Sequence, residues 1–181
     1  LDFSDNKIVT IGWTGTYSSK IYLDQLRDVF KRLSKRVKFK LKVIGNFKYD
    51  FPGIDLEVIE WNLENEIRDL QTFDIGIYPL PLDSWVHGKS GLKAIQYMAL
   101  GLPCVATDIG TTPMIIKDKV NGRLVKSDDE WIKALEDLVR YPESRRLIGE
   151  QARREVMTKY SLNTIGNTYD NVLKEVMERV K

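Results

Sequence analysis

The sequence predicts a single α/β domain: a doubly wound parallel sheet (Rossmann-like) of about six strands with flanking helices and a helical C-terminal tail. Three observations predict this class. Short β-branched runs alternate with amphipathic helical segments up to residue 125. Residues 74–80 are apolar almost throughout, which is typical of a strand buried on both faces of a parallel sheet. From residue 128 onward the periodicity is helical.

Each strand is predicted from an apolar run that ends at turn residues. The expected strands are residues 7–13, 39–44, 56–59, 74–80, 104–107 and 123–125. The first helix, capped by Ser18 or Ser19, carries an apolar stripe on an otherwise basic surface. This stripe comprises Tyr22, Leu23, Leu26, Val29, Phe30 and Leu33. Further helices are expected at about residues 64–70, 90–100, 130–141, 143–159 and 163–180.

The helix at residues 90–100 is expected to have two faces. One face should pack on the sheet and consists of Leu92, Ile95, Met98 and Ala99. The other should face away and consists of Lys89, Lys93, Gln96 and Tyr97. Two cations near a helix N-terminus oppose the helix dipole, so their pairing there favours a bound anion.

The composition excludes several classes of protein. In 181 residues, apolar and charged fractions of 43% and 30% are those of a globular domain, not of a disordered chain. With 28 basic and 26 acidic residues, the net charge of +2 predicts no nucleic-acid partner. One cysteine, Cys104, and one histidine, His87, predict neither an internal disulfide nor a zinc site, and no apolar run approaches the ~20 residues that span a bilayer.

A ligand site is expected at the loops that follow the strands, because ligands of doubly wound sheets bind outside the carboxyl ends of the strands. The candidate loops are residues 12–19, 61–65, 81–90 and 108–112. In the third of these, Lys89 and the backbone N–H groups of Ser90, Gly91 and Leu92 would form a phosphate site together with Lys93. The alternative is that both lysines are solvated surface residues.

Several short motifs occur in an informative order. Residues 99–105 (ALGLPCV) and 108–110 (DIG) follow the lysine-bearing helix, residues 73–80 (FDIGIYPL) precede it, and residues 121–125 (NGRLV) come after it. Together they resemble the donor-binding core of the retaining family-4 glycosyltransferases of GT-B architecture. The resemblance extends from Lys7 to Val180 and implies that residues 1–181 form the C-terminal, nucleotide-sugar-binding domain, with the N-terminal acceptor domain absent from this chain.

The resemblance implies a set of donor-binding residues. Lys89 and Lys93 would stabilise the departing diphosphate, Gly12 and Gly15 would allow close approach of the backbone, and Trp61 would stack on the base. The full set is Gly12, Gly15, Thr16, Lys20, Trp61, Lys89, Ser90, Gly91, Leu92, Lys93 and Gln96. Plain alternatives are a strand-to-helix turn for the two glycines, a surface lysine for Lys20 and a core position for Trp61. No metal site is expected.

The chain departs from the family pattern at three positions. Gly88 and Gln96 stand where the family has two glutamates that contact the sugar and the ribose, and Trp13 stands where it has an arginine. Gln96 can still bind a ribose hydroxyl through its amide. The departures leave open a second hypothesis, a non-catalytic nucleotide-binding or scaffolding module. An unrelated dinucleotide enzyme is disfavoured, because residues 12–15 lack the G-x-G-x-x-G spacing.

The resemblance also implies the reaction and its setting. The substrate would be a UDP- or GDP-sugar, with no other cofactor. The acceptor would be a glycan or a lipid-linked saccharide in surface polysaccharide or glycolipid synthesis. The enzyme would be cytoplasmic, or peripheral at the inner membrane face. Because transfer occurs between two domains, this domain alone is expected to be inactive.

Overall fold

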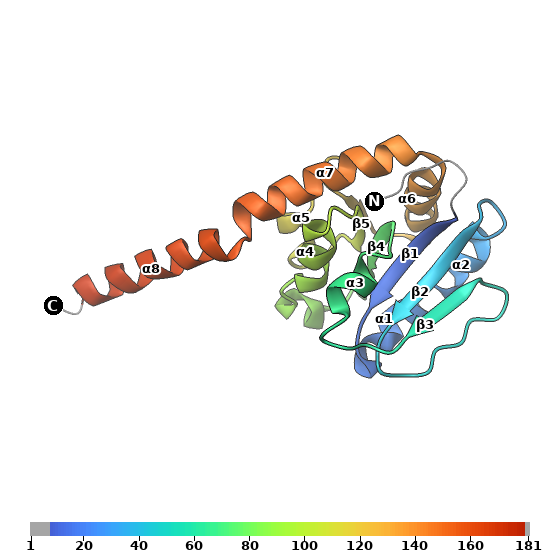
Figure 1. The fold of residues 1–181 in the computed structure, drawn as a ribbon, viewed down its shortest axis with the longest axis horizontal. Coiled ribbons are helices and arrows are strands. Elements are labelled where there is room, and N and C mark those ends of the chain that lie inside the picture. The colour runs from blue at the N-terminus through green and yellow to red at the C-terminus, as the bar shows by residue number, and fades with distance from the viewer. Residues whose placement is uncertain (1–7, 180–181) are drawn as a thin grey trace.

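The computed structural model of the chain describes residues 8–179 and shows one α/β domain of three layers (Figure 1). Six parallel strands form one sheet in the order β3-β2-β1-β4-β5-β6. They are β1 (Val9–Thr14), β2 (Phe39–Ile44), β3 (Leu56–Ile59), β4 (Ile75–Tyr78), β5 (Cys104–Thr107) and β6 (Arg123–Val125). The order runs outward from β1 in both directions, so the predicted doubly wound sheet is confirmed.

The helices agree with the prediction in place, with differences near the site. They are α1 (Lys20–Asp24), α2 (Arg27–Leu33), α3 (Glu66–Leu70), α4 (Leu92–Ala99), α5 (Thr112–Ile115), α6 (Asp128–Arg140), α7 (Pro142–Lys159) and α8 (Leu162–Arg179), with 3-10 turns η1 (Tyr17–Ser19) and η2 (Ser84–Gly88). The sequence predicts one continuous first helix. This prediction is wrong, because the helical hydrogen bonding is interrupted between α1 and α2. Lys7, the predicted start of the first strand, and Val180, the predicted end of the last helix, lie outside the described residues.

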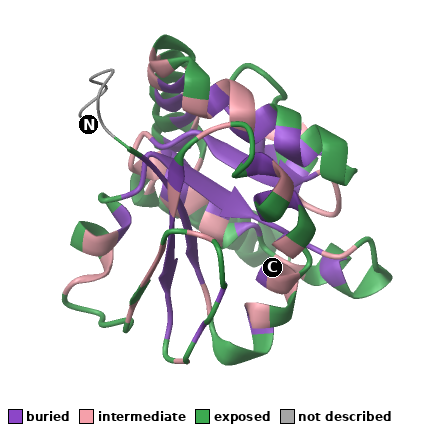
Figure 2. Cartoon of the chain, turned by 90° about the vertical axis from the view of Figure 1, so that its right-hand side faces the viewer, coloured by how far each residue is buried: buried purple, intermediate pink, exposed green. Residues whose placement is uncertain are grey.

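The helices cover both faces of the sheet, and the buried strands lie between them (Figure 2). On one face, α1, α2 and α6 pack on the sheet around Trp13, Phe30 and Trp131. On the other face, α3, α4, α5 and α7 pack around Phe73, Tyr97 and Met98. This second face carries the residues that set the position of α4, and α4 bears Lys93.

Two glycines on neighbouring strands bring α4 close to the sheet. Gly12 in β1 pairs with Gly76 in β4. The position of a Cβ on Gly12 would lie 2.0 Å from the Phe73 ring, and a Cβ on Gly76 would lie 2.4 Å from the Tyr97 ring. The two rings contact each other with their centroids 6.1 Å apart. The missing side chains therefore create the space that both aromatic rings fill.

This packing confirms Met98 on the sheet-facing side of α4 and corrects the predicted positions of Tyr97 and Leu92. Tyr97 is completely buried, whereas Leu92 is 58% exposed. The helix is turned so that Ala94, Tyr97 and Met98 face the sheet. The helical period was correct, but Gly76, the glycine that makes room for Tyr97, lies on another element, β4.

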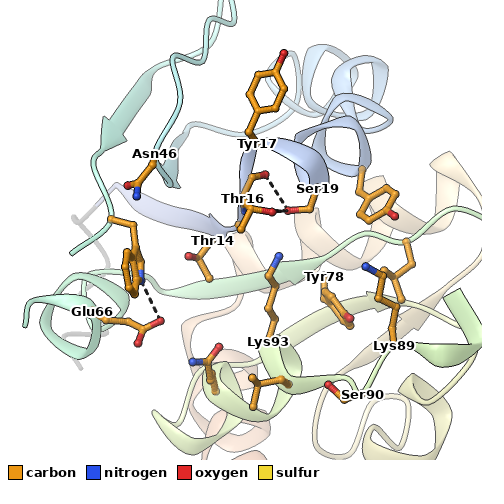
Figure 3. Close-up of a pocket in the computed structure, with 16 residues that line it drawn as sticks. Thr14, Thr16, Tyr17, Ser19, Asn46, Glu66, Tyr78, Lys89, Ser90 and Lys93 are labelled. Atoms are coloured by element: carbon orange, nitrogen blue, oxygen red, sulfur yellow. Dashed lines mark hydrogen bonds between the residues drawn. The ribbon is translucent and has the colours of Figure 1, made fainter. Parts of the chain in front are cut away.

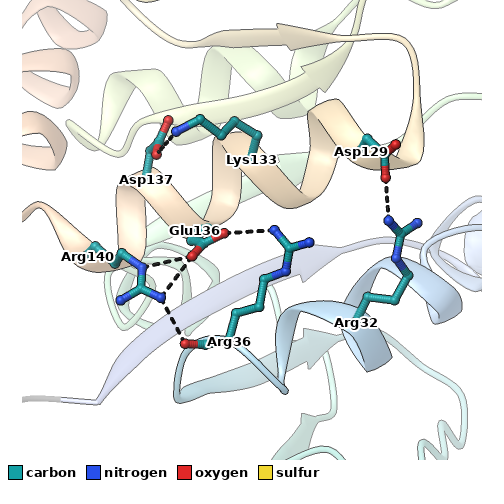
Figure 4. Close-up of polar contacts among 7 residues, drawn as sticks. All are labelled: Arg32, Arg36, Asp129, Lys133, Glu136, Asp137 and Arg140. Carbon is teal, nitrogen blue, oxygen red and sulfur yellow. Dashed lines mark hydrogen bonds and ion pairs between the residues drawn. The ribbon is translucent and has the colours of Figure 1, made fainter.

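Ion pairs connect α2 to α6 at the surface of the opposite face (Figure 4). Arg32 pairs with Asp129, and Arg36 donates to Glu136 at 3.1 Å. Arg140 donates to the same Glu136 carboxylate at 2.9 Å and to the carbonyl of Arg36 at 3.1 Å. Hydrogen bonds from Arg36 and Arg140 lower the pKa of Glu136. The network holds the ends of two helices together on the face remote from the aromatic pair.

The last helix, α8, extends away from the domain (Figure 1). It contains no buried residue, and an apolar stripe along it is exposed. The stripe comprises Leu162, Ile165, Tyr169, Val172, Leu173, Val176 and Met177. The predicted helical tail is therefore confirmed. Across residues 8–179, no helix combines the length and apolar character needed to cross a membrane.

Candidate functional site

A cavity of about 640 Å³ lies beyond the carboxyl ends of the central strands. Its position corresponds to the point between β1 and β4 where the strand order reverses. Eight of the predicted donor-binding residues line it: Gly15, Thr16, Trp61, Lys89, Ser90, Leu92, Lys93 and Gln96. The remaining lining residues are Thr14, Tyr17, Ser19, Tyr22, Asn46, Glu66, Tyr78 and Leu80. The volume is in the range of small-molecule sites.

The loop after β1 forms one wall of the cavity. The Gly15 N–H donates to the carbonyl of Ile44 at 3.0 Å, which extends the pairing of β1 with β2. A Cβ on Gly15 would lie 2.2 Å from the indole of Trp13. The Thr16 N–H donates to Ser19 Oγ at 3.0 Å and fixes the start of η1. The loop is thus held close to the sheet, and its Thr14, Thr16 and Ser19 side chains surround the cavity (Figure 3).

The start of α4 forms the facing wall. Gly91 precedes the helix with a φ of +73°, a left-handed conformation that favours glycine. No side chain caps this end of the helix. Thr111 donates from its hydroxyl to the carbonyl of Lys89 at 2.7 Å and so anchors the preceding loop. Because the first N–H groups of a helix lack partners within the helix, this wall presents backbone donors.

The two lysines lie in this cavity and rest on aromatic rings. Lys93 Nζ is 4.9 Å from the centroid of the Trp13 ring, and Lys89 Nζ is 5.4 Å from that of Tyr22. Within residues 8–179, neither ammonium group forms an ion pair with a carboxylate. Burial, together with the charge of Lys89, lowers the pKa of Lys93 to about 8. An anion bound between the two lysines would offset both the burial of the Lys93 ammonium group and its repulsion by Lys89.

One correction concerns Lys89. It lies in the loop before α4, in extended conformation, and not on a helical face shared with Lys93. Both lysines nevertheless line the same cavity. Figure 3 shows Lys93 in the middle of the cavity and Lys89 toward one side.

Tyr97 positions Lys93, which lies one helical turn earlier on α4. The Thr14 N–H donates to Tyr97 Oη at 3.0 Å in the buried interior. Burial raises the pKa of Tyr97, so its hydroxyl stays protonated. This hydrogen bond ties α4 to the end of β1, where Trp13 supports the Lys93 ammonium group.

The other end of the cavity is polar and acidic, which the sequence did not reveal. Trp61 donates from Nε1 to Glu66 Oε1 at 3.2 Å, and Asn46 lies on the same side (Figure 3). Trp61 is 37% exposed, so the alternative of a core position for it does not apply. Glu66 and Asn46 follow β3 and β2, and only the spatial order of the strands brings them together with Trp61.

Three predicted residues lie outside the lining. Gly12 is inside β1, where the Phe73 ring occupies the position of its missing side chain. Lys20 points to Asp24 at 3.3 Å and to the Tyr49 ring at 5.6 Å. Gly91 only shapes the turn before α4. Gly12 and Lys20 thus have partners within the protein and lie outside the cavity lining.

The two departures from the acidic pattern differ in position. Gln96 lines the cavity with its amide available, whereas Gly88 belongs to η2 and lies outside the lining. A Cβ on Gly88 would meet no atom within 4 Å. Among the described residues, His, Cys, Asp and Glu side chains form no group of three or more that could hold a metal.

The fold and the site together define a Rossmann-like α/β domain with a ligand-sized cavity at the reversal of its strand order. Residues 8–141 match the family described as glycosyl transferases group 1, and the chain belongs to this family of GT-B glycosyltransferases. A D-inositol 3-phosphate glycosyltransferase of Saccharomonospora viridis is 31% identical over 94 residues, which make up 50% of this chain but only 22% of that protein.

Solved structures agree with this assignment of the fold. The C-terminal domain of a glycosyl transferase group 1 family protein from Francisella tularensis has a TM-score of 0.65 at 26% identity, covering 87% of this chain and 90% of that one. A TarM variant of S. aureus, solved with Fondaparinux, alpha-GlcNAc-glycerol and UDP, has a TM-score of 0.73 at 18% identity. That alignment covers 94% of this chain and 37% of TarM.

Proposed function

We propose that this chain is the C-terminal donor-binding domain of a retaining family-4 glycosyltransferase. The substrate is a UDP- or GDP-sugar, and the acceptor is a glycan or a lipid-linked saccharide in surface polysaccharide or glycolipid synthesis. The acceptor half is a separate N-terminal domain, and the enzyme acts in the cytoplasm or at the inner membrane face. No cofactor besides the nucleotide sugar takes part.

One observation carries this proposal: two lysines that have no carboxylate partner among residues 8–179 converge with the start of a helix in a cavity at the strand reversal. A nucleoside diphosphate matches that arrangement, because its phosphate charges are complementary to the ammonium groups and helix N–H donors. The co-crystallised UDP of the TarM variant supports the same class of ligand.

The chemistry follows from the charge that develops during transfer. The bond between the anomeric carbon and the diphosphate oxygen breaks, and its electron pair leaves with the nucleoside diphosphate. Lys93, Lys89 and the N–H groups at the start of α4 stabilise this leaving group. The acceptor hydroxyl oxygen forms the new bond to the anomeric carbon, and its proton passes to the departing diphosphate. Both events occur between two domains, so this chain alone binds the donor and does not turn it over.

Calorimetric titration with UDP, GDP, ADP and CMP, followed by the matching nucleotide sugars, tests the proposal. Lys93→Ala or Lys89→Ala should weaken binding about 10-fold to 100-fold, the effect of losing one charge-assisted hydrogen bond. Lys20→Ala is the matched control, because Lys20 pairs with Asp24 outside the cavity. A large drop in melting temperature with unchanged affinity in the Lys93 variant would show that its role is packing.

A specific observation supports a second candidate, a nucleotide-binding or scaffolding module without catalysis. Gly88 offers no side chain where the resemblance expects a sugar-contacting glutamate, and it lies outside the cavity lining. This candidate predicts equal affinity for a nucleoside diphosphate and for its sugar conjugate. A donor domain should instead bind the conjugate with a different affinity.

A further inference from the structure

The acidic end of the cavity contains a carboxylate that has no cationic partner. Within the described part of the chain, Glu66 forms no ion pair, and its hydrogen bond comes from Trp61 Nε1 at 3.2 Å. This bond uses one of the two lone pairs of Oε1, which leaves both carboxylate oxygens able to accept a further hydrogen bond. Glu66 is half-buried and lines the cavity, so a ligand with N–H donors would find the carboxylate in place.

Trp61 and Glu66 hold each other in a fixed relation. The hydrogen bond orients the indole, and the ring remains 37% exposed at the cavity. A flat aromatic surface next to a carboxylate suits a flat ligand whose edge carries donors: the ring stacks on its face, and the carboxylate accepts from its edge. Stacking discriminates little between bases, so the selectivity must come from Glu66.

The two ends of the cavity have opposite charge. Glu66 and Asn46 lie to one side of Lys93, while Lys89 and Ser90 lie toward the other (Figure 3). A nucleoside diphosphate bound with its phosphates at the lysines would therefore place its base at the acidic end. The reverse orientation would bring phosphate next to Glu66 and leave the lysines without an anion.

We infer that Glu66 selects guanine, so that the donor is a GDP-sugar; this inference rests on the proposed function. Guanine presents two adjacent donors, N1–H and the N2 amino group, which match the two oxygens of a carboxylate. Uracil presents one N–H between two carbonyl oxygens, which would oppose the carboxylate. Adenine and cytosine present an amino group next to a ring nitrogen that accepts. The amide of Asn46 can donate to guanine O6.

The test compares GDP, IDP and UDP by calorimetry on the 181-residue chain and on Glu66→Gln. IDP lacks only the N2 amino group, so the difference between GDP and IDP isolates one contact with Glu66. GDP should bind the unmodified chain about tenfold or more tightly than either IDP or UDP. In Glu66→Gln, the amide oxygen can still accept from Trp61, whereas the preference for GDP over IDP should shrink to less than about threefold.

Glu64→Gln is the matched control, because Glu64 lies two residues before the start of α3 and outside the cavity lining. It should retain the full preference for GDP, and circular dichroism should show that both variants are folded. Equal binding of GDP, IDP and UDP that still requires Lys93 would overturn the guanine inference and leave the proposed function standing. A preference for GDP that persists in Glu66→Gln would overturn the role of Glu66. No binding of any nucleotide at millimolar concentration would overturn both proposals.

Discussion

Replacing Tyr97 with phenylalanine isolates the hydrogen bond that ties α4 to the sheet. The change removes one oxygen and keeps the ring that fills the space above Gly76. The Thr14 N–H, which donates to that oxygen at 3.0 Å, is then left in a buried environment without this partner. An unsatisfied buried donor costs about 1–3 kcal/mol in the free energy of unfolding.

The expected loss is large enough to measure by chemical and thermal unfolding. At about 2–4 °C per kcal/mol for a domain of this size, the melting temperature should fall by about 2–12 °C. The denaturant m-value should not change, because the fold and its buried surface are the same. Nucleotide affinity should also decrease, since Lys93 lies one turn from Tyr97 on the same helix.

Tyr169→Phe provides the control. Tyr169 is 68% exposed on α8, so its hydroxyl is solvated and its removal should leave stability within about 0.5 kcal/mol of the unmodified chain. If Tyr97→Phe were as stable as this control, the hydrogen bond to Thr14 would contribute nothing, and the account of how α4 is positioned would be refuted.

Two further predictions concern the lysine pair and the glycines. Because the pKa of Lys93 is lowered to about 8, Lys93 loses its proton between pH 7 and pH 9, and nucleoside diphosphate affinity should fall about tenfold over this range. Calorimetry on Lys93→Gln should show an affinity that does not change with pH. Gly12→Ala should lower the melting temperature markedly, since its Cβ would lie 2.0 Å from the Phe73 ring, whereas Gly88→Ala, which meets nothing within 4 Å, should be neutral. Equal melting temperatures for the two alanine variants would contradict the packing argument.

Much of the fold could be predicted from local patterns. β2, β3, β5 and β6 begin and end where their apolar runs do, because each run is bounded by turn residues. Short elements were missed for a physical reason: α5 spans four residues, and a single turn carries no helical period. The break between α1 and α2 is likewise invisible in a stripe that continues through both helices.

The site was only partly predictable, because its two ends depend on different information. Lys89 and Lys93 are close in sequence. They were predicted as site residues because cations near the start of a helix oppose the helix dipole unless an anion is bound. Asn46 follows β2 and Glu66 begins α3, which follows β3, and only the strand order places them on the same side of the cavity. The face of α4 that packs on the sheet was missed because it depends on Gly76 in β4, which no pattern within the helix can show.

The exposed stripe on α8 has a thermodynamic consequence for any interface that it forms. An 18-residue helix with no buried residue receives little tertiary support, although helices in proteins owe most of their stability to the packing of an apolar face. Covering the apolar stripe would supply that support. Association through α8 is therefore coupled to helix formation, and its heat capacity change and unfavourable entropy should be those of a folding reaction as well as of binding.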